Sequence, residues 1–165
     1  MKVIRAVIPV RAGILGLFAV ALCAMLSLAA PSSAAAATRA KTIHRDTVIS
    51  RSKVWVQKRV PYSQRRYYRG YRQDCSGFVS MAWKLGKSHT SRSLPRVGKR
   101  IKPKDAKPGD AVVVPGHAVI FAGWKNKSKK TFYAYEEPSW GGHAHKRVRQ
   151  LKHNAKVLRR PGITG

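Results

Sequence analysis

Only one cysteine, Cys75, lies outside the apolar leader of this chain, in the segment Asp74-Cys75-Ser76-Gly77-Phe78-Val79. The second cysteine, Cys23, falls within the leader, which we expect to be removed. A secreted chain left with a single thiol cannot form an internal disulfide, so its fold must do without that cross-link. The thiol is then a buried small side chain, a partner for another chain, or a nucleophile.

Residues 1–37 have the pattern of a secretory signal peptide. A basic start precedes an apolar run at residues 13–30, and a stretch of small residues follows, so we expect cleavage after Ala35 or Ala37. The alternative is an uncleaved anchor helix, because the run is nearly long enough to span a bilayer. We expect a secreted or cell-wall-associated bacterial protein with no membrane span after the leader.

The chain after the leader, roughly 128 residues (165 minus 37), is long enough for one domain and short for two. Residues 38–45 are polar, basic and unpatterned, which predicts a flexible segment. Residues 46–165 are expected to form the single domain. We expect this domain to be a monomer.

The charge balance is strongly basic, with 34 Lys and Arg against 6 Asp and Glu. The leader holds three of the basic residues and none of the acidic ones, so the remainder carries about +25 (31 minus 6). Such a surface attracts polyanions with an affinity that falls in salt. For an exported protein the first candidates are anionic cell-wall polymers, and nonspecific nucleic acid binding is an alternative. Basic composition alone identifies no partner and also serves solubility.

Two helices are predicted in the first half of the domain. Asp46 can cap a helix with an apolar face, which Pro61 would end. An aromatic and basic loop is expected at 62–72. A second helix is predicted to begin at Cys75, with Asp74 as its N-cap. Gly86 is the expected stop of that second helix.

Short apolar runs after residue 110 predict strands at 111–114, 117–124 and 131–136, with two weaker strands near 145–151 and 156–159. Helices followed by a series of antiparallel strands predict an α+β domain.

The helix start gives Cys75 the chemistry of a nucleophile. Free N–H groups and the helix dipole stabilise a thiolate there, and the same N–H groups can bind an oxyanion. Small residues at Ser76 and Gly77 suggest room for a substrate. Of six histidines, His117 stands apart, because it begins an apolar strand after Pro115-Gly116 and can act as the base. A buried cysteine and a hydrogen-bonded strand histidine are the plain alternatives.

A metal site would have to draw on dispersed residues. No Cys-x-x-Cys or His-x-x-x-His pair is present, so we predict no metal site and no cofactor. The candidates for such a site would be Cys75, His117, His143, His145 and His153.

Four segments in this order resemble the NlpC-type (p-sixty) cell-wall cysteine peptidase family. They are Val60-Pro61-Tyr62, Asp74-Cys75-Ser76-Gly77-Phe78-Val79, Pro108-Gly109-Asp110 and Gly116-His117-Ala118-Val119-Ile120-Phe121. The resemblance extends over about residues 46–160. It implies a papain-like α+β fold and hydrolysis of amide bonds in peptidoglycan stem peptides by a Cys-His thiolate mechanism, as an endopeptidase or amidase.

The resemblance also implies roles for individual residues. Cys75 would be the nucleophile and His117 the general base, with Tyr62 lining the site near the substrate or oxyanion. We place Asp74 and Ser76 there as well. The residue that orients the histidine is usually His, Asn or Gln on the next strand, and Glu136 stands there in this chain. The alternatives to Glu136 are Tyr135 and His145.

One departure from the family pattern concerns the groove wall. Family members usually carry a Trp-Gly-Gly-like stretch soon after the tyrosine, where this chain has residues 63–68 instead. The arginine- and tyrosine-rich segment 65–72 suits stacking and charge contacts. It motivates a second hypothesis, in which a weak or inactive NlpC-like scaffold serves as a basic binder of wall polymers.

Overall fold

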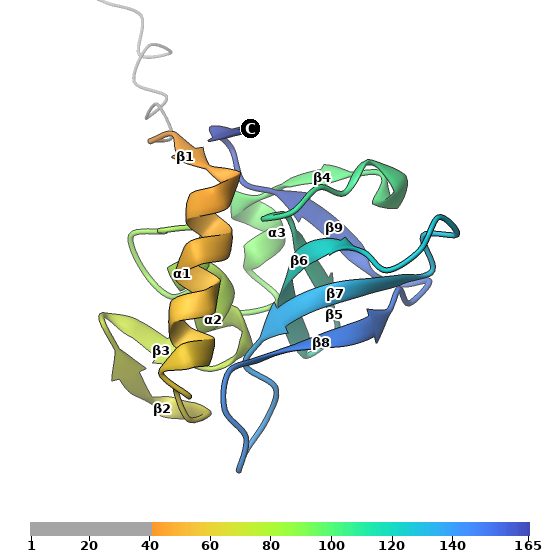
Figure 1. Ribbon diagram of the computed structural model, residues 1–165. Coiled ribbons are helices and arrows are strands. Elements are labelled where there is room, and N and C mark those ends of the chain that lie inside the picture. The colour runs from red at the N-terminus through yellow and green to blue at the C-terminus, as the bar shows by residue number, and fades with distance from the viewer. Residues whose placement is uncertain (1–40) are drawn as a thin grey trace, which may run out of the picture. The chain divides into compact units, whose positions relative to one another are not determined.

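The computed structural model describes residues 41–165. The predicted signal peptide and residues 38–40 lie outside the described part. The described chain has helices packed on one face of a twisted sheet, with a small hairpin beside them (Figure 1). No helix within residues 41–165 has the length and apolar character needed to cross a bilayer.

Three α-helices and a 3-10 turn occupy the first part of the described chain. They are α1 (Arg45–Gln57), α2 (Cys75–Ala82), α3 (Leu94–Val97) and the 3-10 turn η2 (Pro103–Asp105). The helix from Cys75 is confirmed, with the Asp74 carboxylate accepting a hydrogen bond from Gly77 N–H at 2.7 Å. It ends at Ala82 rather than near Gly86, because Lys84 adopts a positive φ of 52°.

The large sheet has six antiparallel strands in the order β4-β9-β5-β6-β7-β8. Its strands are β4 (Lys99–Ile101), β5 (Ala111–Val114), β6 (His117–Trp124), β7 (Thr131–Glu136), β8 (His145–Gln150) and β9 (Lys156–Arg159). All five predicted strands are therefore confirmed, and the α+β class with them. The short β4 was not predicted.

A hairpin of β2 (Ser63–Tyr68) and β3 (Tyr71–Gln73) replaces most of the predicted loop at 62–72. β2 is largely exposed and β3 is only three residues long, so neither has the apolar alternation that marks a strand in sequence. The turn residues Arg69 and Gly70 both have positive φ, 50° and 81°, as a type I′ hairpin turn requires.

The prediction of a flexible segment at residues 38–45 is wrong for its last three residues. Ile43 and His44 form β1 (Ile43–His44), which pairs in parallel with β10 (Ile163–Thr164). The helix then begins at Arg45, one residue before the predicted cap. Arg45 is buried because its guanidinium donates to the Asp110 carboxylate at 2.9 Å and to the Gly165 carbonyl at 2.7 Å.

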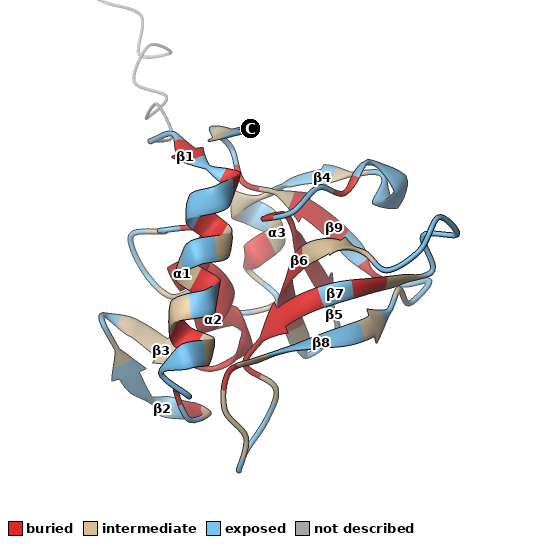
Figure 2. Cartoon of the chain, in the orientation of Figure 1, coloured by how far each residue is buried: buried red, intermediate tan, exposed pale blue. Residues whose placement is uncertain are grey.

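The core lies on both faces of the sheet (Figure 2). On the helix side, α2 is buried over its whole length between α1 and β6, with Trp55 and Phe78 in edge-to-face contact. On the other side, Phe121 and Phe132 stack with centroids 5.4 Å apart. Burial of α2 places the N-terminal end of the helix, and with it Cys75, at the end of the sheet strands.

Candidate active site

Cys75 is the first residue of α2 and is only 7% exposed. Its Sγ lies 3.9 Å from the carbonyl oxygen of Gly116, on the turn that leads into β6. A cysteine here faces the free N–H groups and the positive end of the helix dipole, which favour a thiolate. The turn between β5 and β6 and the start of α2 therefore meet at the thiol.

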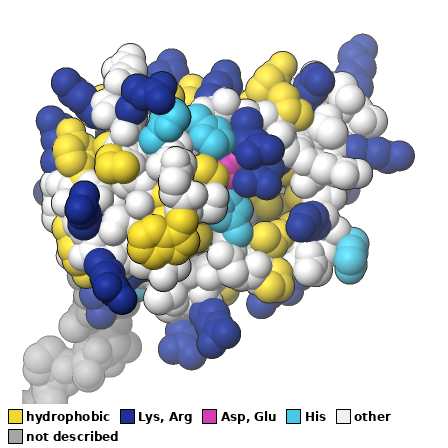
Figure 3. Space-filling view, turned by 90° about the horizontal axis from the view of Figure 1, so that it is seen from below, with side chains coloured by type: hydrophobic (Ala, Val, Ile, Leu, Met, Phe, Trp, Pro, Cys, Tyr) yellow, Lys and Arg dark blue, Asp and Glu magenta, His cyan; other side chains and the backbone are white. Residues whose placement is uncertain are grey.

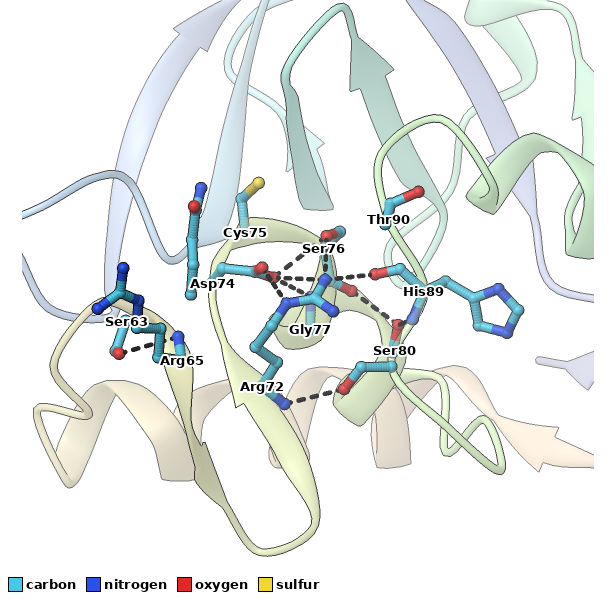
Figure 4. A network of polar contacts seen from close by, with 12 residues as sticks. Ser63, Arg65, Arg72, Asp74, Cys75, Ser76, Gly77, Ser80, His89 and Thr90 are labelled. Carbon is cyan, nitrogen blue, oxygen red and sulfur yellow. Dashed lines mark hydrogen bonds and ion pairs between the residues drawn. The ribbon is translucent and has the colours of Figure 1, made fainter.

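A polar network below the thiol holds the helix start (Figure 4). The Arg72 guanidinium contacts the Asp74 carboxylate and donates to Ser76 Oγ at 3.2 Å and to the His89 carbonyl at 2.9 Å. Ser76 Oγ in turn donates to Asp74 Oδ1 at 3.1 Å. In the same view the Cys75 side chain points away from this network, toward the strands of the large sheet.

This network changes the interpretation of three residues near the nucleophile. Asp74 and Ser76 are 5% and 3% exposed and bond to each other and to Arg72, so their side chains hold the start of α2. Their contact with substrate stays a prediction. Gly77 has a packing role. A Cβ there would lie 1.9 Å from the Arg72 carbonyl oxygen, so glycine permits the close packing of β3 on α2.

His117, at the start of β6, lies between two partners. Its Nε2 is 2.7 Å from Glu136 Oε2, and Cys75 Sγ lies against the preceding residue, Gly116. Because Nε2 faces the carboxylate, Nδ1 is the ring nitrogen left for the thiol. Burial alone would lower the pKa of His117, but the nearby Cys75 and the hydrogen bond with Glu136 outweigh it and raise the pKa to about 9. At neutral pH the imidazolium therefore persists beside the thiol.

Glu136, at the end of β7, is fully buried and surrounded by cationic groups. Arg149 holds it with two hydrogen bonds, one of them from Nε to Oε1 at 2.9 Å. Arg147 Nε and His145 Nε2 each lie 3.6 Å from Oε1. Burial alone would raise the pKa of Glu136, whereas His117 and Arg149 lower it to about 2. The carboxylate thus stays charged throughout the neutral range.

Sequence reasoning missed Arg149. Its signal is the alternation of His145, Arg147 and Arg149 along β8, which puts all three on one face of the sheet. In the register of the two strands, His145 pairs with Glu136, and Arg149 pairs with Phe132. A period-two row of cations on a strand beside an acidic strand end is the pattern that could have revealed the contact.

The two alternatives to Glu136 lie differently. Tyr135 points to the opposite face of the sheet and is buried in the core under the helices. His145 contacts Glu136 at 3.6 Å rather than lying between Glu136 and the thiol. Of the three candidates, Glu136 is the one in hydrogen-bond contact with His117.

Tyr62 precedes Ser63, which pairs with Gln73, two residues before Cys75. Burial raises the pKa of the Tyr62 hydroxyl, and charge interactions with Cys75 and Asp74 add to the increase. A Trp-Gly-Gly stretch at residues 140–142 contacts Tyr62 from the loop between β7 and β8. Trp140 packs edge-to-face on Tyr62 with centroids 5.6 Å apart, and the Gly142 carbonyl accepts the Tyr62 N–H at 2.9 Å.

Two cavities border these residues. One, of about 330 Å³, is lined by His117, Arg149 and Pro138 among others, and the second, of about 340 Å³, is lined by Tyr62 and Trp140 with neighbouring residues. Figure 3 shows histidine and basic side chains gathered around a small acidic spot on one face of the molecule.

Within residues 41–165, no group of three His, Cys, Asp or Glu side chains is arranged to hold a metal ion.

Glu137 follows Glu136 and is equally buried, but within residues 41–165 neither of its carboxyl oxygens has a hydrogen-bond partner. Burial, together with the negative charge of Asp74, raises the pKa of Glu137 to about 8. The carboxyl is therefore protonated at neutral pH. An ionised group in this position would be a buried charge with no partner, which is costly.

Glu137 gives the folded protein a pH-dependent stability. Between its ordinary pKa of 4.5 and about 8, the unfolded chain releases this proton while the folded chain keeps it. Stability should therefore fall as pH rises, by up to about 1.4 kcal/mol per pH unit. Urea unfolding of wild type and Glu137→Gln should show the variant gaining relative stability from pH 5 to pH 8. If the difference in free energy of unfolding between wild type and Glu137→Gln were the same at pH 5 and pH 8, the raised pKa of Glu137 would be wrong.

No protein-family model matches the chain, and neither does any curated protein sequence. Solved structures do match. The peptidoglycan hydrolase RipB from Mycobacterium tuberculosis superposes with a TM-score of 0.51 and 23% identity over 70% of this chain and 63% of its own. The p-sixty domain of an antigen from M. avium subspecies paratuberculosis gives a TM-score of 0.51 and 19% identity over 70% of this chain and 93% of its own.

The chain thus spans less than two thirds of RipB but nearly the whole of the isolated p-sixty domain. At these identities the likeness concerns the arrangement of helices and strands. The helices on one face of an antiparallel sheet, with Cys75 at a helix start and His117 at a strand start, agree with the sequence motifs. The described chain therefore has the α+β fold of the NlpC/p-sixty domains.

Proposed function

We propose that this chain is a secreted cysteine peptidase that hydrolyses amide bonds in the stem peptides of peptidoglycan. The observation that carries the proposal is a thiol at a helix start, packed against the turn that carries His117, whose imidazole is bonded to the buried Glu136. The fold shared with RipB, which is described as a peptidoglycan hydrolase, supports the choice of substrate.

In this mechanism the thiolate of Cys75 attacks the carbonyl carbon of the amide, and the backbone N–H of Cys75 helps to bind the resulting oxyanion. His117 then gives its proton to the departing amine, so the C–N bond breaks and a thioester remains. His117 next takes a proton from water, whose oxygen attacks the thioester. The new carboxylic acid leaves, and the thiolate and imidazolium are restored.

Glu136 has a positioning role in this proposal. It accepts the Nε2–H of His117, which keeps Nδ1 directed to the thiol and stabilises the imidazolium. Arg149 fixes the carboxylate through its two bonds, so the imidazole is oriented by a group that is itself held. Arg149 thus keeps Glu136, and through it the His117 imidazole, in a productive geometry.

The test is digestion of purified peptidoglycan by the protein without its leader, followed by mass spectrometry of the soluble products. We expect peptide fragments with a new amine and a new carboxyl group, while the sugar linkages stay intact. Release of sugar reducing ends without peptide cleavage would contradict the proposal. Salt-sensitive binding to the wall without any cleavage would favour the alternative of a basic polymer binder.

A further inference from the structure

An exposed tryptophan stands beside the candidate active site on the loop between β7 and β8. Trp140 is 65% exposed, yet its position is held by the edge-to-face contact with Tyr62. The loop is tied to the same segment by the bridge between Pro61 and His143 and by the bond from Tyr62 N–H to the Gly142 carbonyl. A large ring that is fixed at one edge and open on its face is suited to stacking against a ligand.

Two arginines without a carboxylate partner border the cavity of about 340 Å³ that Tyr62 and Trp140 line. Arg65 and Arg66 line it together with Tyr62, Ser63 and Trp140. Among residues 41–165, neither arginine has a carboxylate partner, whereas five other arginines and three histidines contact one. A guanidinium without a partner next to a concave surface can bind a carboxylate through two parallel hydrogen bonds.

The backbone that carries these arginines is ordered before any ligand binds. The buried Ser63 hydroxyl accepts hydrogen bonds from the N–H groups of Arg65 at 3.2 Å and Arg66 at 3.0 Å. The strand register shifts between Ser63 and Tyr67, so the chain bulges at this point. A fixed backbone lowers the entropy that the site loses on binding.

We propose that this cavity, lined by Tyr62, Trp140, Arg65 and Arg66, binds an acidic sugar chain. The face of a sugar ring packs on Trp140, and a carboxylate carried by the chain pairs with the two guanidinium groups. Because Ser63, next to Tyr62, pairs with Gln73, two residues before Cys75, a sugar chain bound here would bring an attached peptide toward the thiol. This part of the inference rests on the proposed function, and it extends that function to the sugar chain, which is bound but not cleaved.

The test is isothermal titration of the Cys75→Ala protein with two tetrasaccharides of matched length. Hyaluronan tetrasaccharide alternates N-acetylglucosamine with glucuronate, whereas chitotetraose carries N-acetylglucosamine alone. We expect the acidic sugar to bind more tightly than the neutral one. Trp140→Ala should weaken the acidic sugar about tenfold, the loss expected for one aromatic stacking contact. Arg65→Ala combined with Arg66→Ala should remove the preference for the acidic sugar.

Matched controls come from the same hairpin. Tyr67→Ala removes an aromatic side chain that is 63% exposed, and Arg69→Ala removes a cation that stacks on Tyr68. Neither control should change the affinity. The proposal is overturned if Trp140→Ala binds as wild type does. It is also overturned if poly(glycerol phosphate) or polyglutamate competes as well as the acidic sugar, because the site would then recognise charge alone.

These titrations are separate from catalysis. They use a variant without the thiol, so a protein that fails to cleave stem peptides can still bind the sugar. Conversely, cleavage of a stem peptide that carries no sugar would support the proposed function even where the sugar does not bind.

Discussion

Cys75→Ala is expected to reduce stem-peptide cleavage by at least about a thousandfold, because loss of a nucleophile removes the covalent route. The thiol is 7% exposed and its Sγ makes one long contact with the Gly116 carbonyl, so the fold should tolerate alanine. Cleavage rates on purified muropeptides and the midpoint of thermal unfolding check both parts. We expect a large loss of rate with a shift of only a few degrees in Tm.

The same variant should change the titration of His117. Cys75 is one of the two groups that raise the pKa of His117 to about 9, so its removal should lower that pKa. NMR titration of the imidazole measures the shift. Full cleavage activity in Cys75→Ala would exclude the thiol mechanism, whatever the imidazole does.

Glu136→Gln is expected to reduce the cleavage rate by up to about 10⁴-fold, the loss known for the change of the carboxylate behind a catalytic histidine to an amide. The amide no longer stabilises the imidazolium and leaves Arg149 without its charged partner. The pKa of His117 should fall from about 9, because Glu136 is one of the groups that raise it. The alkaline limit of the pH–rate profile should therefore move to lower pH.

Glu137→Gln is the matched control for this substitution. The two glutamates are adjacent and equally buried, but Glu136 contacts His117 whereas Glu137 has no hydrogen-bond partner within the described chain. Rates measured near pH 6, where Glu137 is protonated, separate the two effects. If both variants cleaved at the same rate, the orienting role of Glu136 would be wrong.

Local signals in the sequence were enough to place the nucleophile and the main strands. An aspartate before a short apolar helix predicted both the N-cap at Asp74 and the helix from Cys75. The three apolar strands were placed with the bounds that the structure has, because each is buried and ends at a turn. These features depend on capping, on periodicity and on turn residues, which act over a few positions.

One prediction failed where distant segments meet. Arg45 looked like part of a flexible segment, but it is buried against Asp110 and Gly165, far along the chain. The residue type was compatible with exposure, and only the packing of other elements decided its partners.

Local interactions specify the α+β order of elements, a thiol at a helix start and a histidine at a strand start, so these could be predicted from the amino-acid sequence. The hydrogen bonds of Arg149 to Glu136 behind His117, and the packing of Trp140 on Tyr62, became visible only in the folded chain. The first contact arises from the register of β7 with β8, and the second from the loop between these strands, which lies against the segment that follows α1. Such pairings are long-range, so no short segment of sequence encodes them.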